Sequence, residues 1–351
     1  MINVSSVKIG SSGIFFVVDS MNNKLQFSKD IILEAIYMQS DVKIVDQNGA
    51  EHFINLPIKI ISDEDIICVN CKPYRGYLEL YKSINKINVI NVLDIDNYVK
   101  GVLIKEMGMT KRIEALKVQA IISRTYAFVN FNKHQSQGFN VCSTTHCQVY
   151  GGIEVETIDS NKAVSNTRDE VLLYNEQLAE TVYHANCGGH TDSPKYIWKC
   201  KNDVPNYLKG VKCGFCDDNP HTKWMHVMSK DFIKKKLMRN NIIIGEIENI
   251  RINNKTQFGT TESLEILHSD GSFIINSYEF RIIVDSDGIK SHDFDSVEIY
   301  DNKVYFKGKG YGHKVGLCQC GAIKMAENGM IYNEILSHFY PDTKIEKILY
   351  E

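Results

Sequence analysis

The spacing of apolar residues changes abruptly along this chain, and that change constrains the fold more than any other feature. Residues 1–93 alternate short β-branched or aromatic runs with polar turns, as in Val42-Lys43-Ile44-Val45, which is the pattern of consecutive strands. Residues 111–131 instead place apolar side chains every three or four positions. With Thr110 as a suitable N-cap, this period predicts the longest helix of the chain.

The remaining segments complete an α+β pattern. Residues 139–227 are rich in loops, residues 229–239 predict a short basic helix, and residues 241–307 return to strands. Two further helices are expected near Gly321 and Asn333. We therefore expect mixed strands and a central helix to form one unit, which carries a β-rich inserted or second domain. The expected boundaries are 1–93, 94–228, 229–307 and 308–351.

Charge and hydropathy exclude several classes of protein. The 351 residues include 40 basic and 43 acidic side chains, so the net charge of −3 provides no field for nucleic acid, and no nucleic-acid partner is expected. No run reaches the ~18 to 20 apolar residues that span a bilayer. The N-terminus also lacks the charged and apolar regions of a signal peptide. We expect the chain as given to be soluble.

Two stretches far apart in the sequence point to an enzyme with a cleft. The first contains Glu106, which has apolar neighbours and precedes the helix of residues 111–131. On that helix Lys117 and Arg124 are seven residues apart, so they share one face with part of the apolar stripe. The second stretch, residues 308–322, is dense in glycine, which lets the backbone approach a ligand closely.

Several motifs occur in the order of a known family. They are residues 91–99, 100–108, 114–127, 146–150, 184–191, 308–322 and 335–340. On these motifs the chain, from about Tyr74 to its C-terminus, resembles the stage II sporulation protein D family of peptidoglycan lytic transglycosylases, which has relatives among amidase-enhancer proteins. The resemblance implies cleavage of the bond between N-acetylmuramic acid and N-acetylglucosamine during engulfment in sporulation, in strands stripped of stem peptides. It places the catalytic core in residues 94–228, completed by residues 308–351.

The resemblance implies that Glu106 is the catalytic acid and base. Hydrolysis of a glycoside uses two carboxylates, but a lytic transglycosylase needs one, which protonates the leaving oxygen and then accepts the proton of the C6 hydroxyl. This chemistry requires a carboxyl that stays partly protonated, as a poorly solvated pocket favours. Arg124 and Lys117 are expected to stabilise that carboxylate or to bind the sugar. Structural salt bridges are the alternative for both cations.

Other candidate residues come from the same motifs. The expected substrate contacts are Tyr126, Tyr183, His184, Tyr311, His313 and Gln319. For the histidines, bracing of a loop is the alternative. The chain departs from the family where Met109-Thr110-Lys111-Arg112-Ile113 replaces Trp-Pro. It departs again at Lys314, Cys318 and Cys320, where Gly, Ser and Tyr are more frequent.

Ten cysteines suggest either metal binding or disulfides. His134, Cys142, His146 and Cys147 provide the donor types that zinc prefers, and we expect a structural Zn²⁺ there and no organic cofactor. Cys187, Cys200, Cys213 and Cys216 form a second knuckle or one or two disulfides. The pairs Cys68 with Cys71 and Cys318 with Cys320 are expected to be buried or cross-strand thiols.

Two rival functions remain from the sequence. One is a non-catalytic wall-binding protein that activates an amidase, and the other is a zinc hydrolase built on His184 and His190. The resemblance implies three partners, namely glycan strands, a cell-wall amidase and a membrane protein of the engulfment machinery. It also implies a location outside the cytoplasmic membrane, where an N-terminal helix normally anchors the family. From the pattern of its first residues, we do not expect that helix in the sequence as given.

Overall fold

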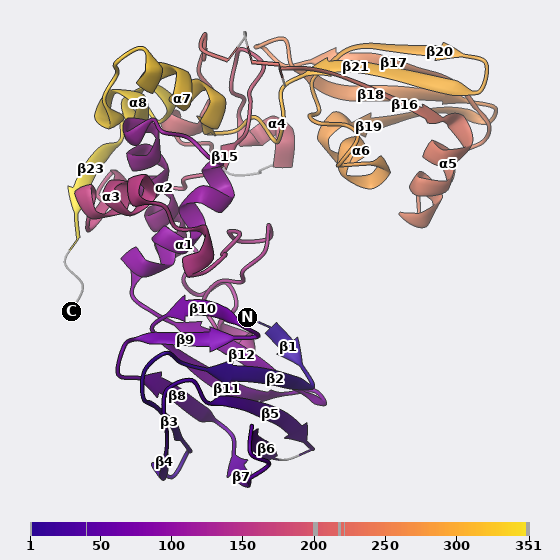
Figure 1. The fold of residues 1–351 in the computed structure, drawn as a ribbon. Coiled ribbons are helices and arrows are strands. Elements are labelled where there is room, and N and C mark those ends of the chain that lie inside the picture. The colour runs from indigo at the N-terminus through magenta and orange to yellow at the C-terminus, as the bar shows by residue number, and fades with distance from the viewer. Residues whose placement is uncertain (1, 40, 199–202, 217–218, 221, 349–351) are drawn as a thin grey trace. The chain divides into compact units, whose positions relative to one another are not determined.

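The computed structural model describes residues 2–39, 41–198, 203–216, 219–220 and 222–348 (Figure 1). The chain divides into two compact units. One comprises Met1–Lys111, Gln119–Val171 and Lys347–Glu351, and the other comprises Arg112–Val118 and Leu172–Glu346. Helices and mostly antiparallel sheets occur in both units, which confirms the predicted α+β class.

The N-terminal strands of the first unit form two six-stranded antiparallel sheets. One sheet has the order β1 (Ile2–Val4), β12 (Lys86–Val92), β11 (Tyr77–Ser83), β8 (Ile58–Ser62), β3 (Phe15–Val18) and β4 (Lys24–Phe27). The other has the order β10 (Lys72–Arg75), β9 (Ile66–Val69), β2 (Ser6–Gly10), β5 (Ile32–Met38), β6 (Asp41–Asp46) and β7 (Glu51–Asn55). The strand pattern predicted for residues 1–93 is therefore confirmed.

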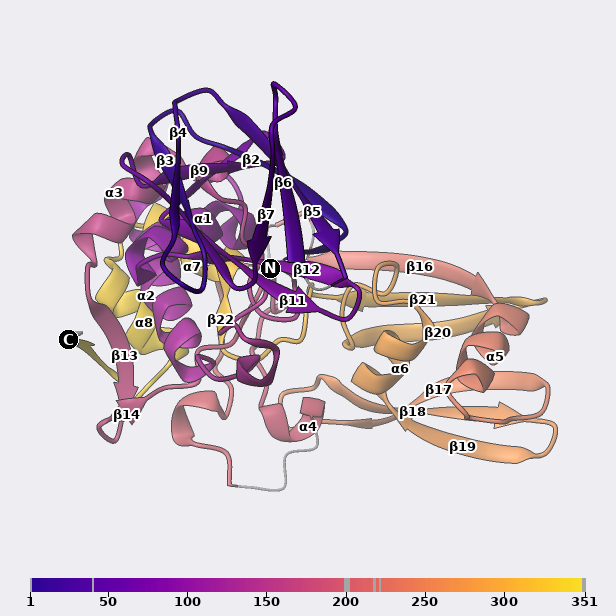
Figure 2. The ribbon, with the colours of Figure 1, turned by 90° about the horizontal axis from the view of Figure 1, so that it is seen from below.

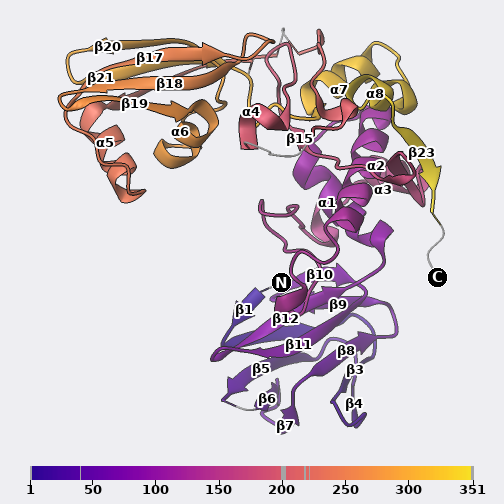
Figure 3. The same ribbon diagram turned by 180° about the vertical axis from the view of Figure 1, so that it is seen from behind.

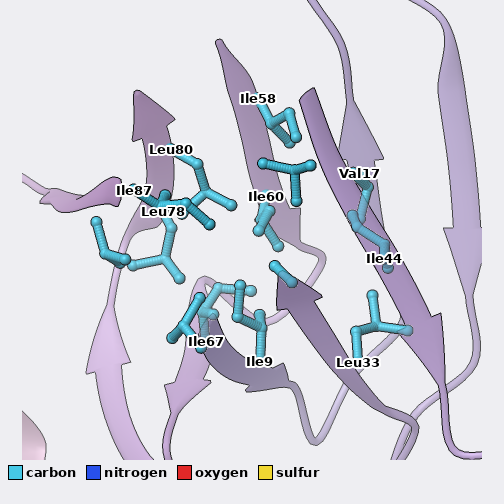
Figure 4. Packing of buried hydrophobic residues seen from close by; sticks show 14 of the residues in the cluster. Ile9, Val17, Leu33, Ile44, Ile58, Ile60, Ile67, Leu78, Leu80 and Ile87 are labelled. Atoms are coloured by element: carbon cyan, nitrogen blue, oxygen red, sulfur yellow. The ribbon is translucent and has the colours of Figure 1, made fainter. Parts of the chain in front are cut away.

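The two sheets share one apolar core. In β8, the buried Ile58 and Ile60 alternate with Lys59 and Ile61, which are exposed, as the two-residue period of a strand requires. Figure 4 shows Ile58 and Ile60 beside residues of the other sheet, such as Ile9 and Leu33. The N-terminal strands thus have a core of their own.

Three helices follow these sheets: α1 (Ile95–Met107), α2 (Ile113–Val129) and α3 (Ile158–Asn166). No pattern in the sequence predicted α1. The helix begins where the Asp94 carboxylate accepts the Asn97 amide over 2.9 Å, and it ends at Gly108, whose φ of 75° suits glycine. The central helix α2 was predicted correctly, although it begins at Ile113, three residues beyond the expected cap Thr110.

The second unit contains two three-stranded sheets. One has the order β16 (Lys223–Ser229), β21 (Lys303–Lys309) and β20 (Phe294–Tyr300), and the other β17 (Ile247–Lys255), β18 (Thr261–His268) and β19 (Gly271–Asn276). Helices α5 (Lys230–Arg239) and α6 (Ser277–Val284) lie on the same side of these strands (Figures 2 and 3). The short basic helix α5 was predicted, whereas α6 falls in a segment that was predicted as strands.

Shorter elements complete the second unit. They are β13 (Glu170–Tyr174), which begins in the first unit, β14 (Gln177–Leu178), β15 (Tyr183–His184), α4 (Pro194–Trp198), β22 (Leu317–Cys318), α7 (Gln319–Glu327), α8 (Tyr332–Phe339) and β23 (Lys344–Lys347). The two predicted C-terminal helices are thus present. Strands β15 and β22 are parallel, which places His184 opposite Cys318. Within the described residues, we find no helix that is both long and apolar enough to cross a bilayer.

Candidate functional site

Glu106 lies in the last turn of α1, where it is partly buried. The backbone N–H of Val149 donates a hydrogen bond to its Oε1 over 2.6 Å. Its neighbour Met107 is buried in the packing of the helix. The carboxyl therefore stands on a rigid element and is oriented by a backbone amide of a distant segment.

The segment around Val149 is packed closely against α1. A Cβ at Gly101 would lie 2.3 Å from a ring carbon of Tyr150, so only glycine allows this approach. The Tyr98 hydroxyl donates to Gln148 Oε1 over 3.1 Å, and Gln148 is fully buried. These contacts hold the Val149 amide at the end of α1 that carries Glu106.

The four residues of the predicted zinc site come together, and we refer to them as the Cys₂His₂ cluster. The donor atoms of His134, Cys142, His146 and Cys147 all lie within 4.8 Å of one another. His146 Nδ1 is 3.8 Å from both sulfur atoms, although His146 and Cys147 are adjacent in sequence. The ring of Phe139 stacks on His134 with centroids 4.6 Å apart. Four protein donors of these types fit a tetrahedral Zn²⁺.

The environment of Cys142 favours the thiolate that a metal binds. Burial acts to raise the pKa of Cys142, but hydrogen bonds with Thr144, His146 and Cys147 together lower it to about 6. Burial raises the pKa of Cys147. Because Cys147 precedes Val149 by two residues, the Cys₂His₂ cluster belongs to the segment that contacts Glu106.

Tyr126 lies beside this cluster. Lys133 Nζ is 3.3 Å from the Tyr126 hydroxyl and also donates to the His146 carbonyl over 2.9 Å. Burial raises the pKa of Tyr126, although Lys133 opposes the shift. The ring is partly buried, and its position links α2 to the Cys₂His₂ cluster.

The structure corrects the expectation that Arg124 faces a cleft. Its side chain has no exposed area, and its Nη2 and Nε bind Asp96 Oδ1 over 2.6 and 3.0 Å. Nη1 donates to the carbonyl of Glu170 over 2.8 Å. Burial of a guanidinium requires such partners. Arg124 thus forms the structural salt bridge that the sequence left as the alternative, and it anchors the first turn of α1 through Asp96.

Lys117 lies in the second unit and has a different environment. Its Nζ lies 2.7 Å from Glu114, one turn earlier in the same helix, and 5.1 Å from the centre of the Tyr332 ring. Glu114 in turn accepts the amide of Tyr332 over 2.9 Å. These contacts tie α2 to the start of α8 and favour a structural role for Lys117.

A pocket of about 530 Å³ also occurs in the first unit. Its mostly apolar lining includes Tyr98, Phe131, Phe139 and Tyr150. Glu106 is not one of the lining residues. The pocket and the proposed acid are therefore separate features of this unit.

The predicted histidines of the second unit meet each other. The rings of His184 and His313 are 5.5 Å apart, and the ring of Trp198, which is 40% exposed, lies 5.2 Å from His313. Burial holds the pKa of His184 well below its ordinary value, and His313 lowers it further. Burial also lowers the pKa of His313 to about 4. Both imidazoles are therefore neutral near pH 7.

The partners of these two rings are mainly backbone groups. His184 Nδ1 lies 3.1 Å from the Val315 carbonyl, whereas the Val315 N–H donates to His313 Nδ1 over 3.1 Å. His184 Nε2 is buried without a hydrogen-bond partner among the described residues. These two histidines therefore brace loops, which was the alternative expected from the sequence. The buried His184 Nε2 has no part in this bracing.

Tyr311 and Gln319 occupy the same glycine-dense segment. Tyr311 is 42% exposed and pairs with Asn186 through two backbone hydrogen bonds of 3.0 and 2.7 Å. Gln319 is the first residue of α7 and is buried. Gly316 has a φ of 70°, and a Cβ there would lie 2.0 Å from the Val182 carbonyl oxygen. This glycine serves the close approach of two backbones.

The cysteines of the second unit differ from the expectation. Cys187, Cys213, Cys216 and Cys318 bring their sulfur atoms within 4.8 Å of one another. Cys200, the expected fourth member, lies outside the described residues. Cys318 is a buried free thiol, as expected, but it belongs to this group, while Cys320 is partly buried and accepts a hydrogen bond from Asn219. The pairing of β15 with β22 brings Cys318 there, and local spacing carries no signal of it.

The structure therefore separates the candidates into two sets. The first unit holds Glu106, Arg124, Tyr126, His134, Cys142, His146 and Cys147, and the second holds Lys117, Tyr183, His184, Tyr311, His313 and Gln319. Asp96 and Trp198 were missed, since a lone acid and a lone tryptophan form no motif. The oriented Glu106 carboxyl on α1 is therefore the candidate acid–base site of this α+β protein.

Comparison with known proteins agrees with this description. A family model described as "Stage II sporulation protein" matches residues 83–174, which include Glu106 and the Cys₂His₂ cluster. The chain is 34% identical over 283 residues to an uncharacterized protein of Brachyspira hyodysenteriae, an alignment that covers 80% of this chain and 74% of that protein. It is 26% identical over 287 residues to stage II sporulation protein D of Bacillus subtilis, covering 77% and 79% of the two chains.

A third relative is the amidase enhancer of Bacillus subtilis. The identity is 28% over 289 residues, and the alignment covers 70% of this chain but only 40% of the amidase enhancer. The chain belongs to the stage II sporulation protein D family, as its motifs predicted.

Proposed function

We propose that this protein acts on the cell wall in sporulation as a peptidoglycan lytic transglycosylase, and that Glu106 is its acid and base. The observation that carries the proposal is the partly buried Glu106 carboxyl, oriented by the Val149 amide inside the segment that the family model matches. The names of two relatives, a stage II sporulation protein D and an amidase enhancer, support a role at the cell wall.

In the proposed reaction, the protonated Glu106 donates its proton to the glycosidic oxygen as the bond to C1 of the muramyl ring breaks. The C6 hydroxyl oxygen then attacks C1, and the Glu106 carboxylate accepts the hydroxyl proton. The result is a 1,6-anhydro sugar and an intact new chain end, without water. Between the two steps the Val149 N–H stabilises the carboxylate by a hydrogen bond to the charged form.

Arg124 acts in this scheme as a positioning residue. It holds Asp96, which lies in the first turn of α1, while Glu106 lies in the last turn of the same helix. A displaced helix would move the carboxyl, and a shift of about 1 Å costs roughly 10²-fold in rate. The ion pair therefore supports catalysis without contact with the sugar.

The second unit offers groups suited to glycan binding. Trp198 and Tyr311 expose aromatic rings, and the neutral His313 lies beside both Trp198 and the neutral, buried His184. Neutral imidazoles donate and accept hydrogen bonds as sugar hydroxyls do. We assign glycan binding to this group, which includes the predicted Tyr183, Tyr311 and His313.

The Cys₂His₂ cluster suits a structural Zn²⁺. All four coordination positions would be filled by protein side chains, whereas catalytic zinc keeps one position for water or substrate. The rival zinc hydrolase on His184 and His190 has weaker support. His190 stacks on Phe258 with centroids 4.0 Å apart, and neither histidine belongs to a metal-ligating group within the described residues.

The second candidate function is a wall-binding protein that activates an amidase. It is favoured by the similarity to the amidase enhancer of Bacillus subtilis. Under either function the partners would be glycan strands, a wall amidase and a membrane protein of the engulfment machinery. The location would be outside the cytoplasmic membrane.

Mass spectrometry of denuded glycan after incubation with the protein separates the candidates. Chains that end in anhydro-muramic acid are expected. Reducing ends would indicate a hydrolase. Unchanged strands, together with faster cleavage by an added amidase, would indicate the accessory function.

A further inference from the structure

Four buried cysteines of the second unit form a compact group that the function proposed above does not use. Cys187, Cys213, Cys216 and Cys318 are each at most 1% exposed, and all four are free thiols. Their sulfur atoms lie within 4.8 Å of one another, with 3.5 Å between those of Cys187 and Cys216. We refer to them as the Cys₄ cluster.

The spacing of the sulfur atoms is that of ligands around one ion. Zn–S bonds of about 2.3 Å in a tetrahedron separate the sulfur atoms by about 3.8 Å. Two disulfides would join the atoms in two pairs, each at bonding distance, whereas here every sulfur is near all three others. A [4Fe–4S] cluster would hold the sulfur atoms further apart, because irons and sulfides lie between them.

The backbone around the Cys₄ cluster has the features of a metal knuckle. Cys213 and Cys216 are separated by two residues, the usual spacing, and between them Gly214 has a φ of 68°. The N–H groups of Cys187 and Gly321 both donate to Cys318 Sγ over 3.3 Å. Such donors orient sulfur ligands and offset their negative charge.

Two further contacts fit charged sulfur in this position. Cys318 is the N-cap of α7, so its sulfur lies at the positive end of a nine-residue helix. A Cβ at Gly321 would lie 2.6 Å from Cys213 Sγ, so a side chain at this position would crowd the group. The first turn of α7 is therefore built around these sulfur atoms.

We propose that the Cys₄ cluster binds one Zn²⁺ as a second, structural metal site, independent of the Cys₂His₂ cluster. The ion joins three segments: the residues after β15, the knuckle of residues 213–216, and the junction of β22 with α7. Because β15 pairs with β22, the ion would also fix Tyr183 and His184 relative to the glycine-dense segment. This site and its test do not depend on the proposed enzymatic activity.

The first test is metal analysis of the full chain, purified without chelator. Two equivalents of zinc per chain are expected, falling to one in Cys216→Ser and to one in Cys142→Ser, which removes a ligand of the Cys₂His₂ cluster. Cys320→Ser is the matched control, since Cys320 is nearby but outside the Cys₄ cluster, and it should retain two. The proposal would be overturned if the wild type held one zinc per chain and Cys216→Ser held the same amount. One iron per chain would also overturn it.

The second test uses folded wild-type protein and remains valid if Cys216→Ser does not fold. Alkylation followed by peptide mass mapping should label the exposed Cys71 and spare the Cys₄ cluster until a chelator is added. Replacement of zinc by Co²⁺ should give sulfur-to-metal absorption that largely persists in the Cys142→Ser/Cys147→Ser variant. Disulfides among the four cysteines, or loss of all that absorption in the double variant, would contradict a Cys₄ site.

Discussion

The backbone amide of Val149 donates a 2.6 Å hydrogen bond to Glu106 Oε1, and Val149 follows the metal-ligand candidate Cys147 by two residues. One short segment thus contributes both to the Cys₂His₂ cluster and to the orientation of the proposed acid. A disturbance of the cluster is therefore expected to reach the carboxyl through two peptide units.

Glu106→Gln should strongly slow cleavage and preserve the fold. The glutamine oxygen still accepts the Val149 amide, but the side chain delivers no proton to the glycosidic oxygen and accepts none from C6. We expect the rate of anhydro-product formation to fall by about 10² to 10⁴-fold, with binding of an N-acetylglucosamine oligomer near the wild-type level.

Glu51→Gln is the matched control for loss of a carboxylate. Glu51 lies in β7, is 46% exposed, and forms an ion pair with Lys43. It should leave cleavage and melting temperature unchanged. Anhydro-product formation by Glu106→Gln at the wild-type rate would refute the assigned role.

Removal of zinc from the Cys₂His₂ cluster should lower stability and activity together, because a structural metal contributes folding free energy. Cys142→Ser should lose one zinc and lower the melting temperature by at least about 4 °C, the shift for roughly 1 to 2 kcal/mol in a unit of this size. Cys71→Ser, at an exposed cysteine, is the control. Full activity in a Cys142→Ser protein that lacks this zinc would show that the Cys₂His₂ cluster does not influence the catalytic role of Glu106.

Arg124→Ala should destabilise the protein rather than impair turnover alone. It leaves Asp96 without its buried partner and removes the donor to the Glu170 carbonyl. Breaking a buried pair costs about 3 to 5 kcal/mol, and the lower end applies because Asp96 is 17% exposed. Lys117→Ala, on the same helix, removes a partly exposed pair and the contact with the Tyr332 ring, and should cost about 1 kcal/mol or less. Equal stability of both variants by urea unfolding would contradict a structural Arg124.

The parts of this molecule that the sequence predicted are those whose signal is local. Apolar alternation identified the strands of residues 1–93, and a period of three to four identified α2. The Cys₂His₂ cluster was predictable because its ligands lie within 14 residues, from His134 to Cys147. Helix α1 was missed, since its apolar residues are interrupted by Lys100, Gly101 and Lys105.

The parts that were not predicted depend on contacts between distant segments. Arg124 binds Asp96 from another helix, and nothing near Arg124 in the sequence distinguishes that pairing from an open cleft. Cys318 joins cysteines more than 100 residues earlier, through the parallel pairing of β15 with β22. The environment of Lys314 also depends on a distant residue. Lys314 has a φ of 63°, and its buried charge is stabilised by an ion pair with Asp293.

Stability should fall on acidification through the neutral histidines of the second unit. The pKa of His313 is lowered to about 4 from the ordinary 6.5, so the unfolded chain binds the proton first. The free energy of unfolding therefore decreases as the pH falls from 6.5 towards 4, whereas this group contributes no pH dependence above 6.5. At about 1.4 kcal/mol per pKa unit, discounted because the ring is partly exposed, the contribution is about 1 to 3 kcal/mol.

His313→Asn keeps an acceptor for the Val315 amide and removes the titrating ring. Urea unfolding of both proteins at pH 7 and pH 4.5 should therefore show a smaller loss of stability in the variant. Burial lowers the pKa of His184 and of His292, and His313 lowers both further, so the difference between the curves reports His313 together with its effect on these two rings. Parallel losses in the two proteins would mean that His313 takes up its proton equally in the folded and unfolded states.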